Sequence, residues 1–208
     1  MKDLTLVNCS TDGTNVTDSR DGKSYTVKKL ESNDVSFCYM LSNLRLDGGT
    51  ILDTATSNVS AEYALPADTG ESGWANDYCK PYMASKGGEY YYNWSAATAR
   101  VNDMVGISSC SNDTDNSVGD ICPFGWRLPN RNDIAEMLWN GGNNPGFLAN
   151  FGRFDVYQHD VGNVGRWWFD NRYSSTYAQY LRLNGASISI NLDGDKKWGY
   201  SVRCMRSS

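Results

Sequence analysis

The sequence has little histidine and no closely spaced cysteines: His159 is its one histidine, and none of its six cysteines forms a CxxC pair. We do not expect a zinc site, because too few nitrogen and sulfur ligands occur at suitable spacings. A serine or cysteine nucleophile would also lack a base, since His159 stands alone in a predicted loop. Asp193 and Asp195 lie in a predicted turn without apolar surroundings to raise a pKa. We therefore expect no catalytic residue, no metal ligand and no cofactor.

Long apolar runs and an excess of positive charge are missing as well. No stretch of about eighteen apolar residues occurs, so no membrane-spanning helix is predicted. The net charge is −5, which offers no basic field for nucleic acid. The first residues lack a signal-peptide pattern, which indicates a cytosolic protein or a chain already cut from an export or assembly module. Nucleic acid binding and membrane insertion are thus not expected.

Cysteines are present in even number and spread over the whole chain. The 208 residues can bury a substantial core, and we expect one domain, 1–208. Several cysteines lie in polar loops where a free thiol would be exposed, which favours three disulfides in an oxidising compartment. Six buried thiols in a cytosolic protein are the alternative. Proximity in sequence suggests that Cys9 pairs with Cys38, and Cys79 with Cys110 could pin an irregular connection.

Strand and turn signals dominate the N-terminal half. A turn at 18–22 precedes an alternating strand over 24–30, and a second strand is expected over 37–46. Residues 47–88 resemble a long irregular connection. The run 89–97 is rich in aromatic residues and ends in a possible short helix. Asn112–Asn116 is an oxygen-rich loop that could hold calcium, although a solvated turn is favoured because the usual glycine and final glutamate are missing.

The second half begins with the clearest helix. Asn130 or Asn132 can cap it, Ile134, Met137 and Leu138 follow helical spacing, and two glycines at 141–142 end it. A second short helix could start at Pro145. Strands are expected over 167–173, 177–183, 187–192 and 198–203, separated in part by the hairpin signals Asn184-Gly185 and Asp193-Gly194.

The segment 165–206 combines tryptophan, tyrosine, serine, asparagine and arginine, a mixture typical of contact surfaces. Part of this segment and of the preceding chain fits the core: Trp126, Trp139, Trp167, Leu181, Leu183, Ile188, Ile190 and Val202. The predicted ligand-binding residues, expected to be exposed, are Trp168, Phe169, Asp170, Asn171, Arg172, Tyr173, Tyr177, Gln179, Tyr180, Arg182, Asn184, Ser187, Ser189 and Asn191.

Five ordered motifs carry a family resemblance. They are SRDGKSYTVKKL at 19–30, CYMLSNLRLD at 38–47, YYNWSAA at 91–97, ICPFGWRLPN at 121–130 and GYSVRCMR at 199–206. Together they resemble the Fibrobacter succinogenes major paralogous domain, which belongs to the C-type lectin fold near its formylglycine-generating enzyme branch. The resemblance implies an α+β fold with short antiparallel strands, one or two short helices and long irregular insertions. It also implies a disulfide between Cys122 and Cys204.

The resemblance leads to a functional expectation. Where the family usually has tryptophan followed by Ser-Ser-Thr, this chain has Trp168–Arg172. The chain is similar to variable proteins of diversity-generating retroelements, including those of archaeal viruses, in which the C-terminal surface is rewritten while the fold is kept. We expect a monomeric display protein, extracellular on a cell or virion surface, that binds a protein or glycan ligand on another cell or virion through residues 165–206. A calcium-dependent glycan-binding adhesin, or a generic cell-surface module, is the alternative.

Overall fold

The structure is a computed structural model of the chain. It describes residues 9–32, 35–70, 80–100, 118–139, 153–154, 158–159, 162–185 and 187–207.

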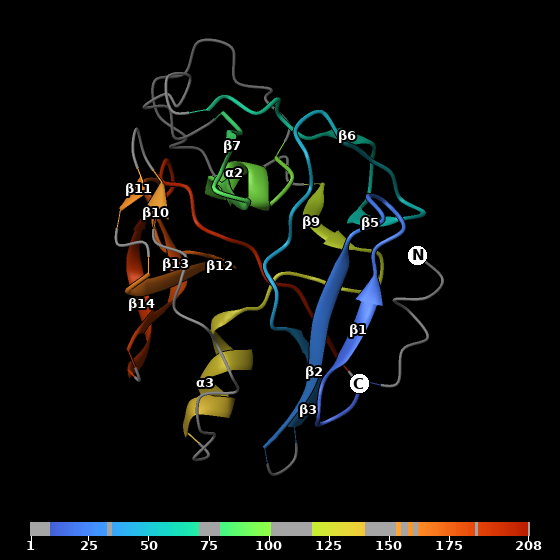
Figure 1. Cartoon of the computed structure of the whole chain (residues 1–208). Coiled ribbons are helices and arrows are strands. Elements are labelled where there is room, and N and C mark those ends of the chain that lie inside the picture. The colour runs from blue at the N-terminus through green and yellow to red at the C-terminus, as the bar shows by residue number, and fades with distance from the viewer. Residues whose placement is uncertain are drawn as a thin grey trace.

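A four-stranded antiparallel sheet holds both chain ends of the described part together. Its order is β1 (Thr14–Thr17), β2 (Ser24–Ser32), β3 (Val35–Met40) and β15 (Met205–Ser207). The last strand thus returns to pair with β3, and Figure 1 marks the C-terminus beside the N-terminal strands. The predicted turn before β2 is present, with Gly22 at a φ of 69° where a residue without a Cβ is favoured.

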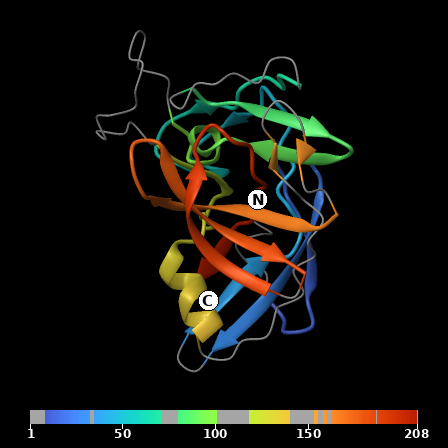
Figure 2. The same cartoon turned by 90° about the vertical axis from the view of Figure 1, so that its left-hand side faces the viewer.

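A second antiparallel sheet carries the predicted binding segment. It consists of β12 (Val164–Arg172), β13 (Tyr177–Asn184) and β14 (Ser187–Asp195), in that order. Figures 1 and 2 show it on one side of the molecule, with helix α3 (Arg131–Trp139) between it and the N-terminal sheet. The remaining elements are helix α2 (Trp94–Ala97) and the strand pairs β4 (Ile51–Leu52) with β6 (Tyr63–Ala64), β5 (Ser57–Val59) with β9 (Gly119–Pro123), β7 (Met83–Lys86) with β8 (Glu89–Tyr92), and β10 (Arg153–Phe154) with β11 (Gln158–His159).

The fold class predicted from the sequence, α+β, is wrong. The described part of the chain is built mainly of antiparallel strands in several small sheets, and its two helices have only four and nine residues. The difference arises largely between residues 47 and 88. This segment was expected to be irregular, but it contributes short strands that pair over distance, such as β5 with β9. The structure is therefore β-rich.

Individual elements agree with the sequence to different degrees. The strands at 24–30, 177–183 and 187–192 and the helix after Pro129 are confirmed, and Asn130 is the cap because its Oδ1 accepts from the backbone N–H of Asn132 and Asp133. The strand expected at 198–203 is wrong: this stretch makes isolated bridges at Tyr200 and Ser201. The loop at 112–116 and the helix expected from Pro145 lie outside the described residues.

Two of the three expected disulfides lie in the described part, and both are confirmed. Cys9 bonds to Cys38, and Cys122 bonds to Cys204 across 82 positions of sequence. The second bond is the one that the family resemblance implied. The pair Cys79 and Cys110 lies outside the described residues.

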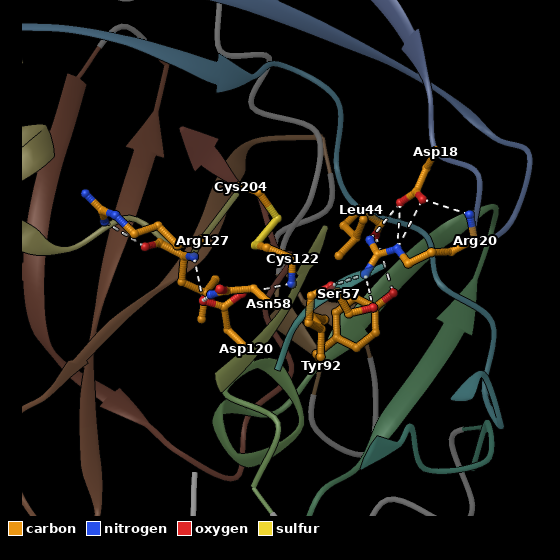
Figure 3. Close-up of a disulfide and its surroundings, with 12 residues drawn as sticks. Asp18, Arg20, Leu44, Ser57, Asn58, Tyr92, Asp120, Cys122, Arg127 and Cys204 are labelled. Carbon is orange, nitrogen blue, oxygen red and sulfur yellow. Dashed lines mark hydrogen bonds and ion pairs between the residues drawn. A yellow bond between two sulfur atoms is a disulfide. The ribbon is translucent and has the colours of Figure 1, made fainter. Parts of the chain in front are cut away.

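A buried carboxyl group organises the chain around the Cys122–Cys204 bond (Figure 3). The Asp120 carboxyl accepts from the backbone N–H of Cys122 at 2.9 Å and of Leu128 at 3.0 Å, and from Nδ2 of Asn58 at 2.7 Å. Burial raises the pKa of Asp120 to about 6, although these three hydrogen bonds oppose the shift. One side chain thus joins β5, β9 and the loop before α3.

We expect Asp120 to make the protein less stable as the pH rises. The pKa of Asp120 is about 6 in the folded protein and about 3.9 in an unfolded chain. The stability that this difference contributes is fully present below about pH 4 and is lost as the pH rises to about 6. The loss is on the order of 3 kcal/mol. Urea unfolding between pH 4 and 8 should show this slope in the wild type and in an Asp12→Asn control, and a flatter one in Asp120→Asn. Equal slopes in all three proteins would contradict the assignment.

Candidate functional site

The three-stranded sheet is fixed to the rest of the molecule through Asn43. Its Oδ1 accepts from Nε1 of Trp167 and from Nε of Arg203, each at 2.8 Å. All three residues are buried, and the Arg203 guanidinium lies 4.4 Å from the centre of the Trp167 ring. Burial lowers the pKa of Arg203 to about 10. These contacts give β12 a defined position on the core.

One face of the sheet packs against the core, as expected. Trp167, Leu181 and Leu183 are buried, whereas Ile188 and Ile190 on the outer strand β14 are only half-buried. The same apolar cluster includes Leu30, Phe37 and Tyr39 near the N-terminal sheet, Ile134 of α3 and Met205 of β15. The predicted burial of Trp126 and Val202 is also confirmed, and the side chain of Trp139 lies outside the described residues.

Three predicted contact residues, Trp168, Phe169 and Tyr180, are instead buried. The Trp168 indole donates to the carbonyl of Tyr92 at 2.8 Å, and its ring centre lies 4.1 Å from that of Tyr200. Tyr180 packs on the same Tyr200 ring at 4.8 Å. The chain after β14 therefore returns over this part of the sheet and covers both aromatic side chains.

Phe169 is buried because β12 bulges beside it. Between the pairs Trp168 with Tyr180 and Arg172 with Ala178, β12 has three residues where β13 has one. The Phe169 carbonyl accepts from Nε1 of Trp94 at 3.0 Å, and the next N–H, of Asp170, donates to the carbonyl of Pro129 at 3.0 Å. The bulge turns the strand toward both helices, which places the Phe169 ring in the core.

Gly194 does not form the predicted hairpin turn. It lies within β14 opposite Ala178, and the turn follows at Asp195, whose carbonyl accepts from the N–H of Trp198 at 2.9 Å. A Cβ atom on Gly194 would lie 2.8 Å from both Trp168 and Tyr180 ring atoms. Glycine is therefore needed here for the close packing of the aromatic cluster.

The exposed part of the predicted site starts at the hairpin between β12 and β13. We call Arg172, Tyr173 and Tyr177 the hairpin tip. Tyr173 is 58% and Tyr177 40% exposed, although both are large and partly apolar. The Tyr177 carbonyl accepts from the N–H of Tyr173 at 3.0 Å and of Ser174 at 2.9 Å, and Nε of Arg172 donates to the Ser174 carbonyl at 3.0 Å. The tip is thus a pair of exposed tyrosines on a hydrogen-bonded loop.

The other predicted contact residues of β13 and β14 follow the solvent side of the sheet. Asn184 and Ser187 are exposed as predicted, whereas Arg182, Ser189 and Asn191 are half-buried, which corrects the expectation that all five are exposed. Cross-strand pairing places Arg182 opposite Ser189 and Asn184 opposite Ser187, on the face away from Leu181 and Leu183. Nδ2 of Asn191 donates to Oγ of Ser189 at 3.0 Å. We call this set the outer face: Arg182, Asn184, Ser187, Ser189 and Asn191.

Two residues that the sequence analysis named lie at the bulge, and a third is half-buried on β13. Asp170 is exposed. Asn171 is half-buried, and its Oδ1 accepts from the N–H of Arg131 at 2.6 Å. The half-buried residue of β13 is Gln179. Although Asp170 is exposed as a residue, partial desolvation of its carboxyl group raises its pKa to about 6, and Arg127 opposes this shift. Asn171 therefore helps to hold the start of α3 as well as contributing to the surface.

Arg166 belongs beside the outer face but was missed from the sequence. It pairs with Arg182 across β12 and β13 and is largely buried. The predicted strand began at Trp167, one residue too late to include it. Continuing the alternation back from Trp168 would have placed Arg166 on the same face.

The surrounding surface shows no further chemistry within the described ranges. No group of three or more His, Cys, Asp or Glu side chains there is arranged to hold a metal ion. Neither described helix is long and apolar enough to cross a membrane. His159 lies in the short strand β11 instead of the loop expected for it. The hairpin tip therefore lies at the start of β13 and the outer face along its second half, with the covered Tyr180 between them.

Comparison with known proteins adds no assignment: no protein-family model matches the sequence, and searches of curated proteins and of solved structures also give no match. The family resemblance drawn from the five motifs stays a prediction.

We expect Gly194→Ala to destabilise the protein by about 1–3 kcal/mol, because the added methyl group would overlap the Trp168 and Tyr180 rings. Gly185→Ala is a matched control in the neighbouring turn. Gly185 has a φ of 58° but open space around its Cβ position, so its cost should be limited to about 1 kcal/mol of backbone strain. Urea unfolding compares the two, and a smaller loss for Gly194→Ala would contradict the packing role.

Proposed function

We propose that the chain is a non-catalytic ligand- or receptor-binding protein that contacts its partner through the hairpin tip and the outer face. The exposure of Tyr173 and Tyr177 on a hydrogen-bonded loop is the observation that carries this proposal. Aromatic rings provide a large contact area at little cost in conformational entropy, and tyrosine and arginine are common among residues that dominate binding energy. A loop already held in place also loses less entropy when it binds.

We propose further that the protein acts outside the cell, on a cell or virion surface. The two disulfides favour an oxidising environment. The outer face offers hydroxyl, amide and guanidinium groups, which suit a polar ligand on another cell or virion. The ligand could be a protein or a glycan, and no described cluster of acidic side chains favours the calcium-dependent alternative.

The arrangement of the sheet also supports diversification of this surface by a retroelement. The residues that hold the sheet, Asn43, Trp168 and Gly194, are buried or closely packed. The side chains that can change with little effect on the core are the exposed ones, Arg172, Tyr173, Asn184 and Ser187. Under this proposal the varied set is smaller than predicted, because Trp168, Phe169 and Tyr180 serve the framework.

We expect the double variant Tyr173→Ala/Tyr177→Ala to bind at least about tenfold more weakly, since two truncated contact tyrosines cost about 1 kcal/mol or more each. The labelled protein can be titrated onto a panel of microbial and animal cells, with bound fluorescence as the measurement. Phe124→Ala is the matched control, because Phe124 is 50% exposed and lies near β5 and β9, away from the sheet. Equal binding by wild type and double variant would contradict the proposed surface.

The gene provides a separate test of diversification. We expect a near-identical template copy of the segment that encodes residues 165–206, beside a reverse transcriptase gene. Its differences from the coding copy should fall at adenines in codons of the hairpin tip and the outer face. Differences concentrated at the codons of Trp168 and Gly194 would contradict the proposal, because changes there disturb the packed framework.

A further inference from the structure

Strand β14 forms an open edge of the three-stranded sheet. Within the described residues its partner is β13 alone, and Figure 1 shows it at the outside of the sheet. It has nine residues, whereas the edge strands of the N-terminal sheet, β1 and β15, have four and three. Natural proteins usually keep edge strands short, because free N–H and C=O groups recruit other strands. The length of β14 is therefore unusual within this molecule.

The first six residues of β14 lack the side chains that usually protect an edge, whereas its last three residues include Asp193 and Asp195 and follow a shift in register. Residues 187–192 read SISINL and contain no proline and no charged residue, the two commonest protecting features. Ile188 and Ile190 face the core side but remain half-buried at its border. An added strand would cover this remaining apolar surface.

The hydrogen bonds of β12 establish which backbone groups point outward. The carbonyl of Arg166 and the N–H of Trp168 bond to Ser201, on the side of β12 away from β13. Arg182 and Tyr180 lie opposite these two residues. Backbone groups of successive residues point to alternate sides of a strand, so Arg182 and Tyr180 bond toward β14.

The same alternation continues into β14. Ser189 and Asn191 pair with Arg182 and Tyr180 and therefore bond back to β13. Ile188 and Ile190 direct their N–H and C=O groups to the open edge. These two residues thus offer the spacing of donors and acceptors that an antiparallel strand would use.

We propose that β14 pairs antiparallel with β14 of a second copy of this chain, forming a symmetric dimer. A two-fold interface must be self-complementary, and the order Ser-Ile-Ser-Ile-Asn has this property around Ser189. With Ser189 on the axis, Ile188 lies opposite Ile190 of the second copy, and these residues exchange backbone hydrogen bonds. The two sheets then join into one sheet of six strands, and the pairing closes on itself.

The dimer differs from the monomer expected from the sequence, and it is independent of the proposed function. It would nevertheless change how the surface is presented. Ser187, Ser189 and Asn191 of both copies would line the same seam, so the two outer faces would form one continuous surface. A partner would then meet two copies of every contact residue.

Sedimentation equilibrium tests the dimer directly. We expect the wild type to show twice its 23.1 kDa mass and Ser189→Lys to dissociate at several-fold higher concentration, because two lysines would meet on the axis. The control Thr17→Lys places the same charge on the exposed edge strand β1 and should leave the dimer unchanged. A wild type that stays monomeric, or a dimer that Ser189→Lys does not weaken, would overturn the proposal.

Cross-linking tests the register without relying on a destabilised variant. Non-hydrogen-bonded antiparallel partners have Cα atoms about 4.5 Å apart, which is within the range of a disulfide. Ser189→Cys should therefore form a covalent dimer under mild oxidation, and Thr17→Cys should not. Failure of Ser189→Cys to link, or exchange protection of the Ile188 and Ile190 amides that persists in a monomer at high dilution, would show that another segment covers this edge.

Discussion

The carboxamide oxygen of Asn43 is the contact on which the rest of the structure most depends. It accepts from Trp167 of β12 and from Arg203 near the C-terminus, and Nδ2 of the same side chain donates to Glu89 at 3.3 Å. Arg203 is a charged group without access to solvent, and such a group is tolerated only where hydrogen bonds compensate it. Asn43 therefore joins the chain after β3, the three-stranded sheet and the segment that ends in Cys204. The position of the contact surface follows from this one side chain.

The division between framework and contact surface has a simple geometric origin. Alternation along β13 places Leu181 and Leu183 on the core side and Arg182 on the solvent side, and β14 repeats the pattern with isoleucine and serine. The chain after β14 then covers the half of the solvent side that carries Trp168 and Tyr180. The other half of the solvent side and the hairpin tip are not covered by this segment. A surface of this kind can change its side chains while the sheet beneath keeps its shape.

Local signals predicted those elements whose partners are close in sequence. Asn184-Gly185 located the hairpin of β13 and β14, and Asn130 located the start of α3. Phe169 could not be placed, because its bulge depends on Trp94 and Pro129 from other parts of the chain. The sequence around Gly194 is the same as that around a turn glycine. Its packing role appears only in the structure, where the Trp168 and Tyr180 rings, from other strands, lie against it. The site was thus predicted by region, while the exposure of its aromatic residues required tertiary contacts.

The return of β15 to the N-terminal sheet has a consequence for how the protein reaches its native state. β3 receives its outer neighbour from residues 205–207, and Cys122 receives its partner at position 204. A growing chain must therefore keep β3, the Cys122 thiol and the apolar groups around them uncovered until residues 204–207 have been synthesised. Contacts that span so much sequence also slow the search for the native topology. The core is thus completed only after residues 204–207 have been synthesised, and its apolar segments stay accessible to other molecules until then.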